Sequence, residues 1–233
     1  MLFGLFYFDW TILLVIPAFI FSLWTQFKVQ STYKKYSSLP TRSGLTGVAA
    51  ARQILDANGL YNVKIEHIRG ELNDHYDPKA QVIRLSDAVH DSASAAAVGV
   101  AAHEAGHAVQ YAKGYFPMKL RAFIIPATRF GSFLAMPLFI IGLFMANDYL
   151  MLGGIILYAT VALFQLATLP VEFNASSRAM VALTNGGRLT TDELTSARKV
   201  LTAAALTYVA ALATSLLTLL RLILLAGGGR RRD

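Results

Sequence analysis

Four long apolar runs constrain this chain more than any other feature of its sequence. They cover residues 2–27, 122–146, 149–169 and 201–226, and each is long enough to cross a bilayer, which takes about 20 residues. Only 15% of the 233 residues are charged, whereas a soluble domain has about 25%. The sequence therefore predicts a mainly α-helical membrane protein with about four transmembrane helices.

The distribution of basic residues predicts how these helices are oriented. The net charge is +7, and residues 28–121 hold most of the Lys and Arg side chains. By the positive-inside rule this region is cytoplasmic and the N-terminus is outside. The runs at 122–146 and 149–169 then form a hairpin that leaves and returns to the cytoplasmic side. Because the basic residues are not interleaved with aromatic ones, we expect no nucleic-acid partner.

The last apolar run conflicts with this orientation. Four spans that start outside would place the C-terminus outside, together with three arginines at 230–232. The run either crosses the bilayer against the rule or packs against the cytoplasmic face without crossing. The predicted organisation is an N-terminal anchor (1–27), a cytoplasmic α+β catalytic region (28–121), a transmembrane hairpin (122–170), a helical segment with the third ligand (171–199), a C-terminal apolar helix (200–226) and a basic tail (227–233).

The region at 28–121 has the patterns of a small α+β unit. A helix is predicted at 44–59, capped by Thr46 and stopped by an Asn-Gly pair. Alternating residues at 61–65 and 81–85 predict two strands, which we expect to pair, with a hairpin as one arrangement. The turn-rich stretch between them predicts a polar loop. We expect 81–85 to be an edge strand that holds substrate.

An alanine-rich helix is predicted to follow these strands, and it carries the sequence His-Glu-x-x-His. It begins at Asp91 or Ser92 and stops near Gly114. His103 and His107 are four residues apart and share one helix face, so both imidazoles can bind one Zn²⁺. The intervening glutamate, at position 104, is placed to deprotonate a zinc-bound water.

A zinc peptidase site needs three protein ligands and one open position. The chain has no cysteine, and the other histidines, His67, His75 and His90, all precede the motif. Among the later acids, Asp148 falls on the opposite side of the membrane, and the others at 192, 193 and 233 belong to a helix start or the terminus. Glu172 remains as the predicted third ligand.

Catalysis also needs a group that stabilises the oxyanion formed when water attacks a peptide carbonyl. By chemistry the candidates are His75, Tyr76 and Arg178. Arg178 follows the predicted third ligand by six residues, so it approaches the site if 171–183 is helical. Each of these residues also has an ordinary structural or surface role as an alternative.

Several segments together resemble the YugP-type neutral zinc metallopeptidases of bacteria. They are His-Glu-Ala-Gly-His-Ala-Val-Gln at 103–110, Asp-His-Tyr-Asp-Pro at 74–78, Leu-Ser at 85–86 and Pro-Val-Glu-Phe-Asn-Ala-Ser at 170–176. The chain is more distantly similar to the HtpX and CAAX prenyl protease families. The resemblance implies zinc ligands His103, His107 and Glu172, with Glu104 catalytic. Distant relatives have an Asp that orients a zinc ligand where this chain has Ser176, so Asn174 or Asp87 is expected to orient a ligand instead.

These observations predict a membrane-embedded endopeptidase with a gluzincin-like catalytic unit and one Zn²⁺ per chain. Its expected location is the bacterial plasma membrane, as a multi-pass protein whose active site faces the cytoplasm. The expected partners are the lipid bilayer and membrane-associated protein or peptide substrates, and any membrane-protein partner stays unidentified. The alternative is a non-enzymatic membrane scaffold or partner subunit in which zinc only braces the fold.

Overall fold

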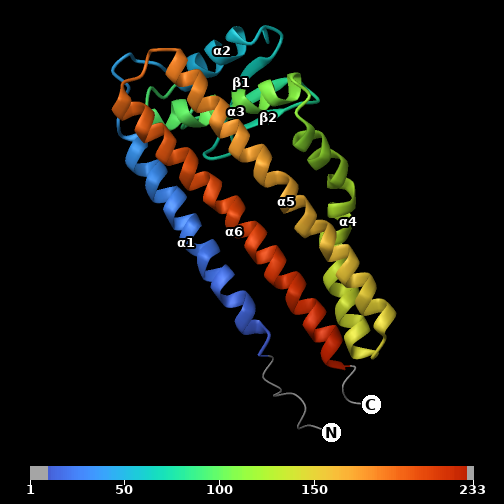
Figure 1. Ribbon diagram of the computed structural model, residues 1–233. Helices are drawn as coiled ribbons and strands as arrows, with labels where there is room; N and C mark the ends of the chain where they lie inside the picture. Colours follow the sequence, from blue (N-terminus) through green and yellow to red (C-terminus); the bar gives the residue numbers. More distant parts are fainter. Residues whose placement is uncertain (1–9, 230–233) are drawn as a thin grey trace. The chain divides into compact units, whose positions relative to one another are not determined.

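The computed structural model describes residues 10–229, so the first residues of the predicted anchor and the arginines of the basic tail lie outside it (Figure 1). The described chain is mainly helical and includes a small three-stranded sheet. Its elements are α1 (Ile12–Ser37), α2 (Gly47–Ala57), β1 (Lys64–Ile68), β2 (His75–Asp77), β3 (Val82–Ser86), α3 (Ala95–Ala112), α4 (Phe116–Phe144), α5 (Asp148–Asn185) and α6 (Thr191–Gly229).

The described chain forms two compact units. The first comprises residues 10–24, 121–167 and 209–229, and the second comprises residues 25–120 and 168–208. Each of the four long helices, α1, α4, α5 and α6, contributes residues to both. These four helices are long and apolar enough to cross a membrane, as the hydropathy of the sequence predicts.

The first unit is built from apolar helices that approach closely at glycines. A Cβ added to Gly131 would lie 2.3 Å from Oγ1 of Thr160, and one on Gly154 would lie 2.7 Å from Cβ of Phe139. Small residues of this kind allow membrane helices to pack backbone to backbone. Between 11% and 22% of each apolar window is buried. Most of the apolar surface therefore faces outward, which suits a lipid environment.

The long helices differ from their predicted bounds. α1 continues ten residues past 27 to Ser37, and α4 begins at Phe116 rather than 122. The apolar run at 149–169 and the helical segment that follows it are one helix, because α5 runs through Pro170 to Asn185. A proline inside a helix removes one backbone hydrogen bond, and membrane helices tolerate that loss. The helix predicted to start near residue 190 and the last apolar run are one helix, α6.

The second unit holds the sheet, whose strand order is β1–β3–β2. β1 runs parallel to β3, with Lys64 opposite Val82, and β2 runs antiparallel to β3, with Tyr76 opposite Ile83. The expected hairpin is therefore wrong, as is the assignment of 81–85 to an edge. Part of the stretch predicted as a polar loop forms β2, and β3 is the central strand, buried at four of its five residues. The free edges belong to β1 and β2.

α2 has the cap that the sequence predicts. Oγ1 of Thr46 accepts a hydrogen bond from the backbone N–H of Ala49, and the helix ends at Ala57 with Asn58 as its C-cap. The following Gly59 has φ +73°, which a glycine adopts without steric cost. The first residue, Gly47, is required by close packing, because a Cβ there would lie 2.2 Å from the carbonyl oxygen of Val89.

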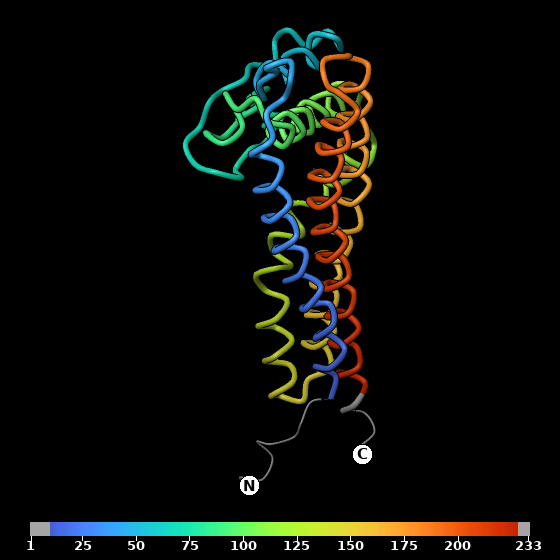
Figure 2. The backbone as a smooth tube through the Cα atoms, turned by 90° about the vertical axis from the view of Figure 1, so that its left-hand side faces the viewer, coloured from blue at the N-terminus to red at the C-terminus, as the bar shows by residue number. Residues whose placement is uncertain are grey.

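α3 lies at the centre of the second unit. The core joins α3 to α2, β3 and the adjacent parts of α5 and α6, and Figure 2 shows the orange stretches of α5 and α6 beside it. α3 begins after Ser94, whose Oγ accepts from Ala97 N–H at 3.2 Å. The predicted start at Asp91 or Ser92 is too early, because residues 90–93 pair by backbone hydrogen bonds with residues 41–48. The predicted stop is confirmed, with Gly114 at φ +63°.

Candidate metal centre

Three side chains from two helices converge in the interior of the second unit. His103 and His107 come from α3, and Glu172 comes from α5. Nε2 of His103 lies 3.3 Å from Oε2 of Glu172, and Nε2 of His107 lies 3.4 Å from the same oxygen. Glu172 is 3% exposed and His107 is 8% exposed. The structure thus brings together the three residues that the sequence predicts as ligands.

These separations fit a zinc ion. Zinc bonds of about 2.0–2.1 Å in a tetrahedral site place neighbouring ligand atoms about 3.3–3.4 Å apart. Two imidazoles and one carboxylate are also the donor set of one type of catalytic zinc site, which keeps its fourth position for water or substrate. The donor atoms of His103, His107 and Glu172 all lie within 4.8 Å of one another, so one ion can contact all three.

Each histidine is oriented through its other ring nitrogen. Nδ1 of His103 lies 3.0 Å from Oγ of Ser176, and Nδ1 of His107 lies 3.0 Å from Oε1 of Gln110. A carboxamide oxygen only accepts hydrogen bonds. Nδ1 of His107 therefore carries the ring proton and donates a hydrogen bond to Oε1 of Gln110. The lone pair of Nε2 is then directed toward Glu172, as a metal ligand requires.

Gln110 is the residue of this centre whose role the sequence did not reveal. It is 0% exposed, and its Nε2 donates to the carbonyl oxygen of Val171 at 2.7 Å and to Oδ1 of Asn174 at 3.0 Å. Because both amide protons have acceptors, Oε1 must face His107. The available signal was spacing, since Gln110 follows His107 by three residues and shares its helix face.

The residues expected to orient a ligand have different partners from those predicted. Asn174 acts through Gln110 rather than on a histidine directly. The expectation for Asp87 is wrong, because its carboxylate bonds to His67 and to the backbone N–H of Gly70. Ser176, which stands where the resemblance led us to expect an acid, contacts the candidate ligand His103 through its hydroxyl.

Glu104 lies beside the three ligands and is held by the sheet. Its Oε2 accepts a hydrogen bond from the backbone N–H of Tyr76 in β2 at 3.0 Å. Burial raises the pKa of Glu104, against the opposing effect of His107 and His103. One carboxylate oxygen is thus anchored, while the group as a whole lies in a desolvated setting next to the metal position.

The three oxyanion candidates lie in different surroundings. Tyr76 packs edge-on against Tyr111, with ring centres 6.1 Å apart. His75 is on the opposite face of β2, where its ring nitrogens lie 2.8 Å from the carbonyl oxygen of Asn73 and 3.4 Å from Nη1 of Arg84. β2 therefore directs Tyr76, rather than His75, toward α3.

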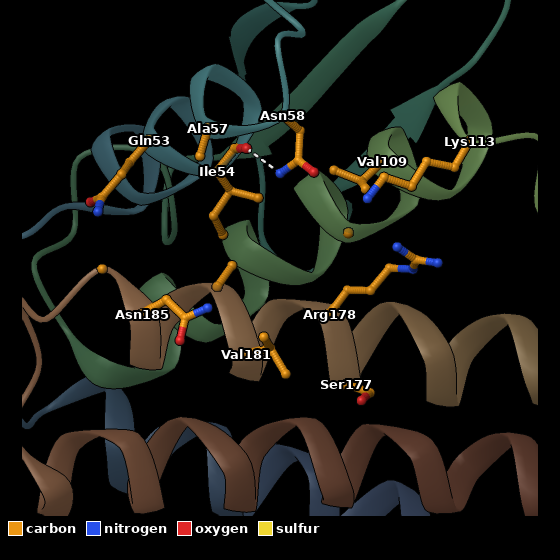
Figure 3. A pocket seen from close by; sticks show the side chains of 13 residues that line it. Gln53, Ile54, Ala57, Asn58, Val109, Lys113, Ser177, Arg178, Val181 and Asn185 are labelled. Carbon is orange, nitrogen blue, oxygen red and sulfur yellow. Dashed lines mark hydrogen bonds between the residues drawn. The ribbon is translucent and has the colours of Figure 1, made fainter.

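Arg178 lines a separate hollow of about 490 Å³ between α2, α3 and α5 (Figure 3). Its Nε donates to Oδ1 of Asn174 at 2.7 Å, and its guanidinium lies 6.0 Å from the ring centre of Tyr115. In Figure 3 the side chains of Arg178 and Lys113 reach the same end of the hollow. A chain of hydrogen bonds therefore connects this hollow to His107 through Asn174 and Gln110.

Two comparisons with known proteins match this chain over nearly its whole length. Residues 11–227 match the protein family described as "Putative neutral zinc metallopeptidase". The chain is also 48% identical over 219 residues to the "Putative membrane protease YugP" of Bacillus subtilis (strain 168), an alignment that covers 94% of this chain and 97% of the relative. No solved structure matches the chain significantly. The family match over nearly the whole chain and the near full-length relative show that the chain belongs to the putative neutral zinc metallopeptidase family.

Proposed function

We propose that the protein is a zinc-dependent endopeptidase of the gluzincin type. The observation that carries this proposal is the convergence of His103, His107 and Glu172, with donor atoms 3.3 and 3.4 Å apart, next to a buried glutamate that is not itself a ligand. A purely structural zinc site closes its coordination sphere with a fourth protein ligand and needs no adjacent base. The arrangement of three ligands and one base supports hydrolysis.

Glu104 acts as the general base and then as the general acid. When bound, Zn²⁺ would supply Lewis acidity that lowers the pKa of a coordinated water. In this mechanism the Glu104 carboxylate would accept a proton from the attacking water and return it to the amine that leaves the cleaved peptide bond. Burial keeps bulk water from competing for this carboxylate, and the Tyr76 N–H holds one of its oxygens in place. Tyr76 is the oxyanion candidate whose strand contacts this base.

β2 is the strand that we propose holds the substrate. It is an edge strand of the sheet, and its Tyr76 N–H bonds to Glu104 instead of to β3. The edge of β2 that faces away from β3 is therefore directed at the metal position. An extended peptide added along this edge would bring a backbone carbonyl close to the site, and peptide recognition by sheet edges commonly works in this way.

The four apolar helices support a role at the membrane. Glu172 belongs to α5, whose apolar part is long enough to cross the bilayer, so the third ligand lies in a helix that also serves as a span. We propose that the substrates are membrane proteins or juxtamembrane segments, that one Zn²⁺ binds per chain and that the site faces the cytoplasm of a bacterial plasma membrane. Residues 28–121, with their excess of basic side chains, support this orientation.

The test separates chemistry from metal binding. Purified wild-type protein, Glu104→Gln and Glu172→Ala are compared for zinc content and for cleavage of a broad panel of peptides. We expect Glu104→Gln to retain zinc and lose cleavage by at least 100-fold, and Glu172→Ala to lose zinc. Cleavage by Glu104→Gln at the wild-type rate would refute the mechanism. Bound zinc in a wild-type protein that cleaves nothing would favour the alternative of a non-enzymatic scaffold.

A further inference from the structure

A basic groove of about 580 Å³ lies between α1 and α6 in the second unit, away from the metal centre. Its charged lining consists of four cations, and the remaining polar residues carry hydroxyl groups. No acidic residue is part of the lining. The residues are Lys28, Ser31, Thr32, Lys35 and Tyr36 of α1, and Thr195, Arg198, Lys199, Thr202, Ala203 and Leu206 of α6.

The helical repeat explains why these residues share one groove. Steps of three residues and one residue alternate along α1, so that lining residues recur three and four apart, and those from α6 follow the same pattern. Residues with this spacing lie on one face of a helix. The two faces meet at Tyr36, which is 8% exposed and packs with Val200 and Ala96. The groove is thus a product of two helix faces brought together by a small core.

Two cations of the groove lie near the same aromatic ring, and none of the four has an ion-pair partner among the described residues. Nζ of Lys35 lies 5.5 Å from the ring centre of Tyr36, and Nζ of Lys199 lies 6.0 Å from the same centre. Within residues 10–229, none of the four cations (these two, Lys28 and Arg198) has a carboxylate oxygen within 4 Å. Like charges gathered at one place repel one another. An anion bound among them would relieve that repulsion.

The position of the groove along its helices indicates which anion it fits. In α1 the apolar run ends at Phe27, immediately before Lys28, and in α6 the last apolar run begins at Leu201, two residues after Lys199. Basic residues at the ends of apolar helices lie at the depth of lipid headgroups. Basic pockets between such helices are suited to anionic headgroups, and the hydroxyl of Thr202 can donate to a phosphate oxygen.

We propose that this groove binds the phosphate of an anionic phospholipid. The four cations neutralise the phosphate, the hydroxyl groups donate hydrogen bonds to it, and the acyl chains remain with the apolar residues that precede Lys28 in α1. A free phosphate compound would bring the same negative charge to the groove but has no acyl chains. This inference does not depend on the proposed peptidase activity, because none of the groove residues belongs to the metal centre.

Tryptophan quenching in membranes tests the proposal. The chain has two tryptophans, so Trp10→Phe leaves Trp24 alone, one helical turn before Lys28. This protein is reconstituted in phosphatidylcholine nanodiscs that contain an increasing fraction of brominated phosphatidylglycerol or, in parallel, brominated phosphatidylcholine. We expect half-maximal quenching at an at least fivefold lower fraction of the brominated phosphatidylglycerol. Equal midpoints for the two lipids would overturn the proposal.

Two four-fold variants separate the groove from the overall charge. In the groove variant Lys28, Lys35, Arg198 and Lys199 are replaced by Gln, and in the control variant Lys34, Lys64, Lys79 and Arg188 are replaced by Gln. Both lose the same charge. We expect the preference for phosphatidylglycerol to fall to less than twofold in the groove variant and to persist in the control. Equal loss in both variants would show bulk attraction and overturn the assignment.

Two further measurements keep the result interpretable. Circular dichroism verifies that each variant is folded, and the pair Lys35→Gln with Lys199→Gln replaces the groove variant if that variant does not fold. Glycerol phosphate is then added at about 10 mM to the wild-type nanodiscs. We expect the lipid preference to survive, since the free headgroup lacks the acyl chains. Complete loss of the preference would identify a free phosphate compound as the ligand and refute the choice of a lipid.

Discussion

Replacing Gln110 by Leu removes the group that orients His107 while keeping the volume of the side chain nearly unchanged. Three hydrogen bonds are lost: the one accepted from Nδ1 of His107 and the two donated to Val171 and Asn174. Asn174 keeps its bond from Arg178. The buried N–H of His107 loses its acceptor, which costs about 1–3 kcal/mol.

The effect on metal binding follows from the same geometry. Without Gln110 the imidazole of His107 can rotate or exchange its tautomer, so Nε2 is no longer held toward Glu172. Loss of a group that orients a metal-binding histidine lowers metal affinity by about 10–100-fold, which corresponds to about 1.4–2.7 kcal/mol. We therefore expect the zinc dissociation constant of Gln110→Leu to rise by this factor, measured by competition with a chromophoric chelator at pH 7.

A matched variant separates local from global effects. Val89→Ala truncates a side chain that is 0% exposed and belongs to the core of the second unit, at a cost of about 2 kcal/mol. We expect Val89→Ala to lower the unfolding temperature and leave zinc affinity unchanged. If Gln110→Leu binds zinc within twofold of the wild-type protein, or if Val89→Ala weakens zinc equally, the orienting role of Gln110 is refuted.

Three further predictions concern packing, topology and pH. Gly106→Ala would place a Cβ 2.6 Å from the carbonyl oxygen of Ala175, so we expect α3 and α5 to separate, with a loss of about 1–3 kcal/mol in a melting experiment; an unchanged melting temperature would contradict this packing. Because the chain has no cysteine, single introduced cysteines can report which side of the membrane a residue faces. We expect a membrane-impermeant maleimide to label Asn147→Cys in intact cells and Ser38→Cys only after permeabilisation. The reverse labelling pattern would refute the proposed orientation. The pKa of Asp77 is lowered by the backbone N–H of Ala80 and by Arg84. The stabilising effect of its carboxylate is therefore present above about pH 4 and is lost as the pH falls through the lowered pKa. The difference in stability between wild type and Asp77→Asn should vanish in acid, and a difference that stays constant with pH would contradict this prediction.

Much of the architecture followed from periodic patterns in the sequence. Apolar runs of more than 20 residues predicted the long helices, because their composition is that of segments that cross a bilayer. The caps of α2 and the glycine stop after α3 were also predicted, since they depend on single residues such as Thr46 and Gly114. The hydropathy pattern did not locate helix ends at which no capping or helix-stopping residue occurs. α5 continues through Pro170, and its residues after this proline pack into the core of the second unit.

The sheet shows where local patterns stop being informative. The strands predicted at 61–65 and 81–85 form at 64–68 and 82–86 and pair with each other, but their parallel direction and the third strand, β2, were not predicted. The sequence of a five-residue strand does not indicate which strands pair with it, because strand pairing depends on long-range packing. β3 is the central strand because β2 forms within the stretch that was predicted as a loop and pairs with the second side of β3. β2 is therefore the strand that contacts Glu104.

The candidate donors of the metal centre and their order along the chain follow from the amino-acid sequence alone. The spacing of His103 and His107 places both on one helix face, and the scarcity of later acids points to Glu172. How these donors are oriented depends on the fold, because Ser176 of α5 contacts His103 directly, and Gln110, which contacts His107 within α3, is itself held by the carbonyl oxygen of Val171 in α5. Ligand spacing along one helix is a local property, whereas these bonds to α5 join residues more than 60 positions apart in the chain.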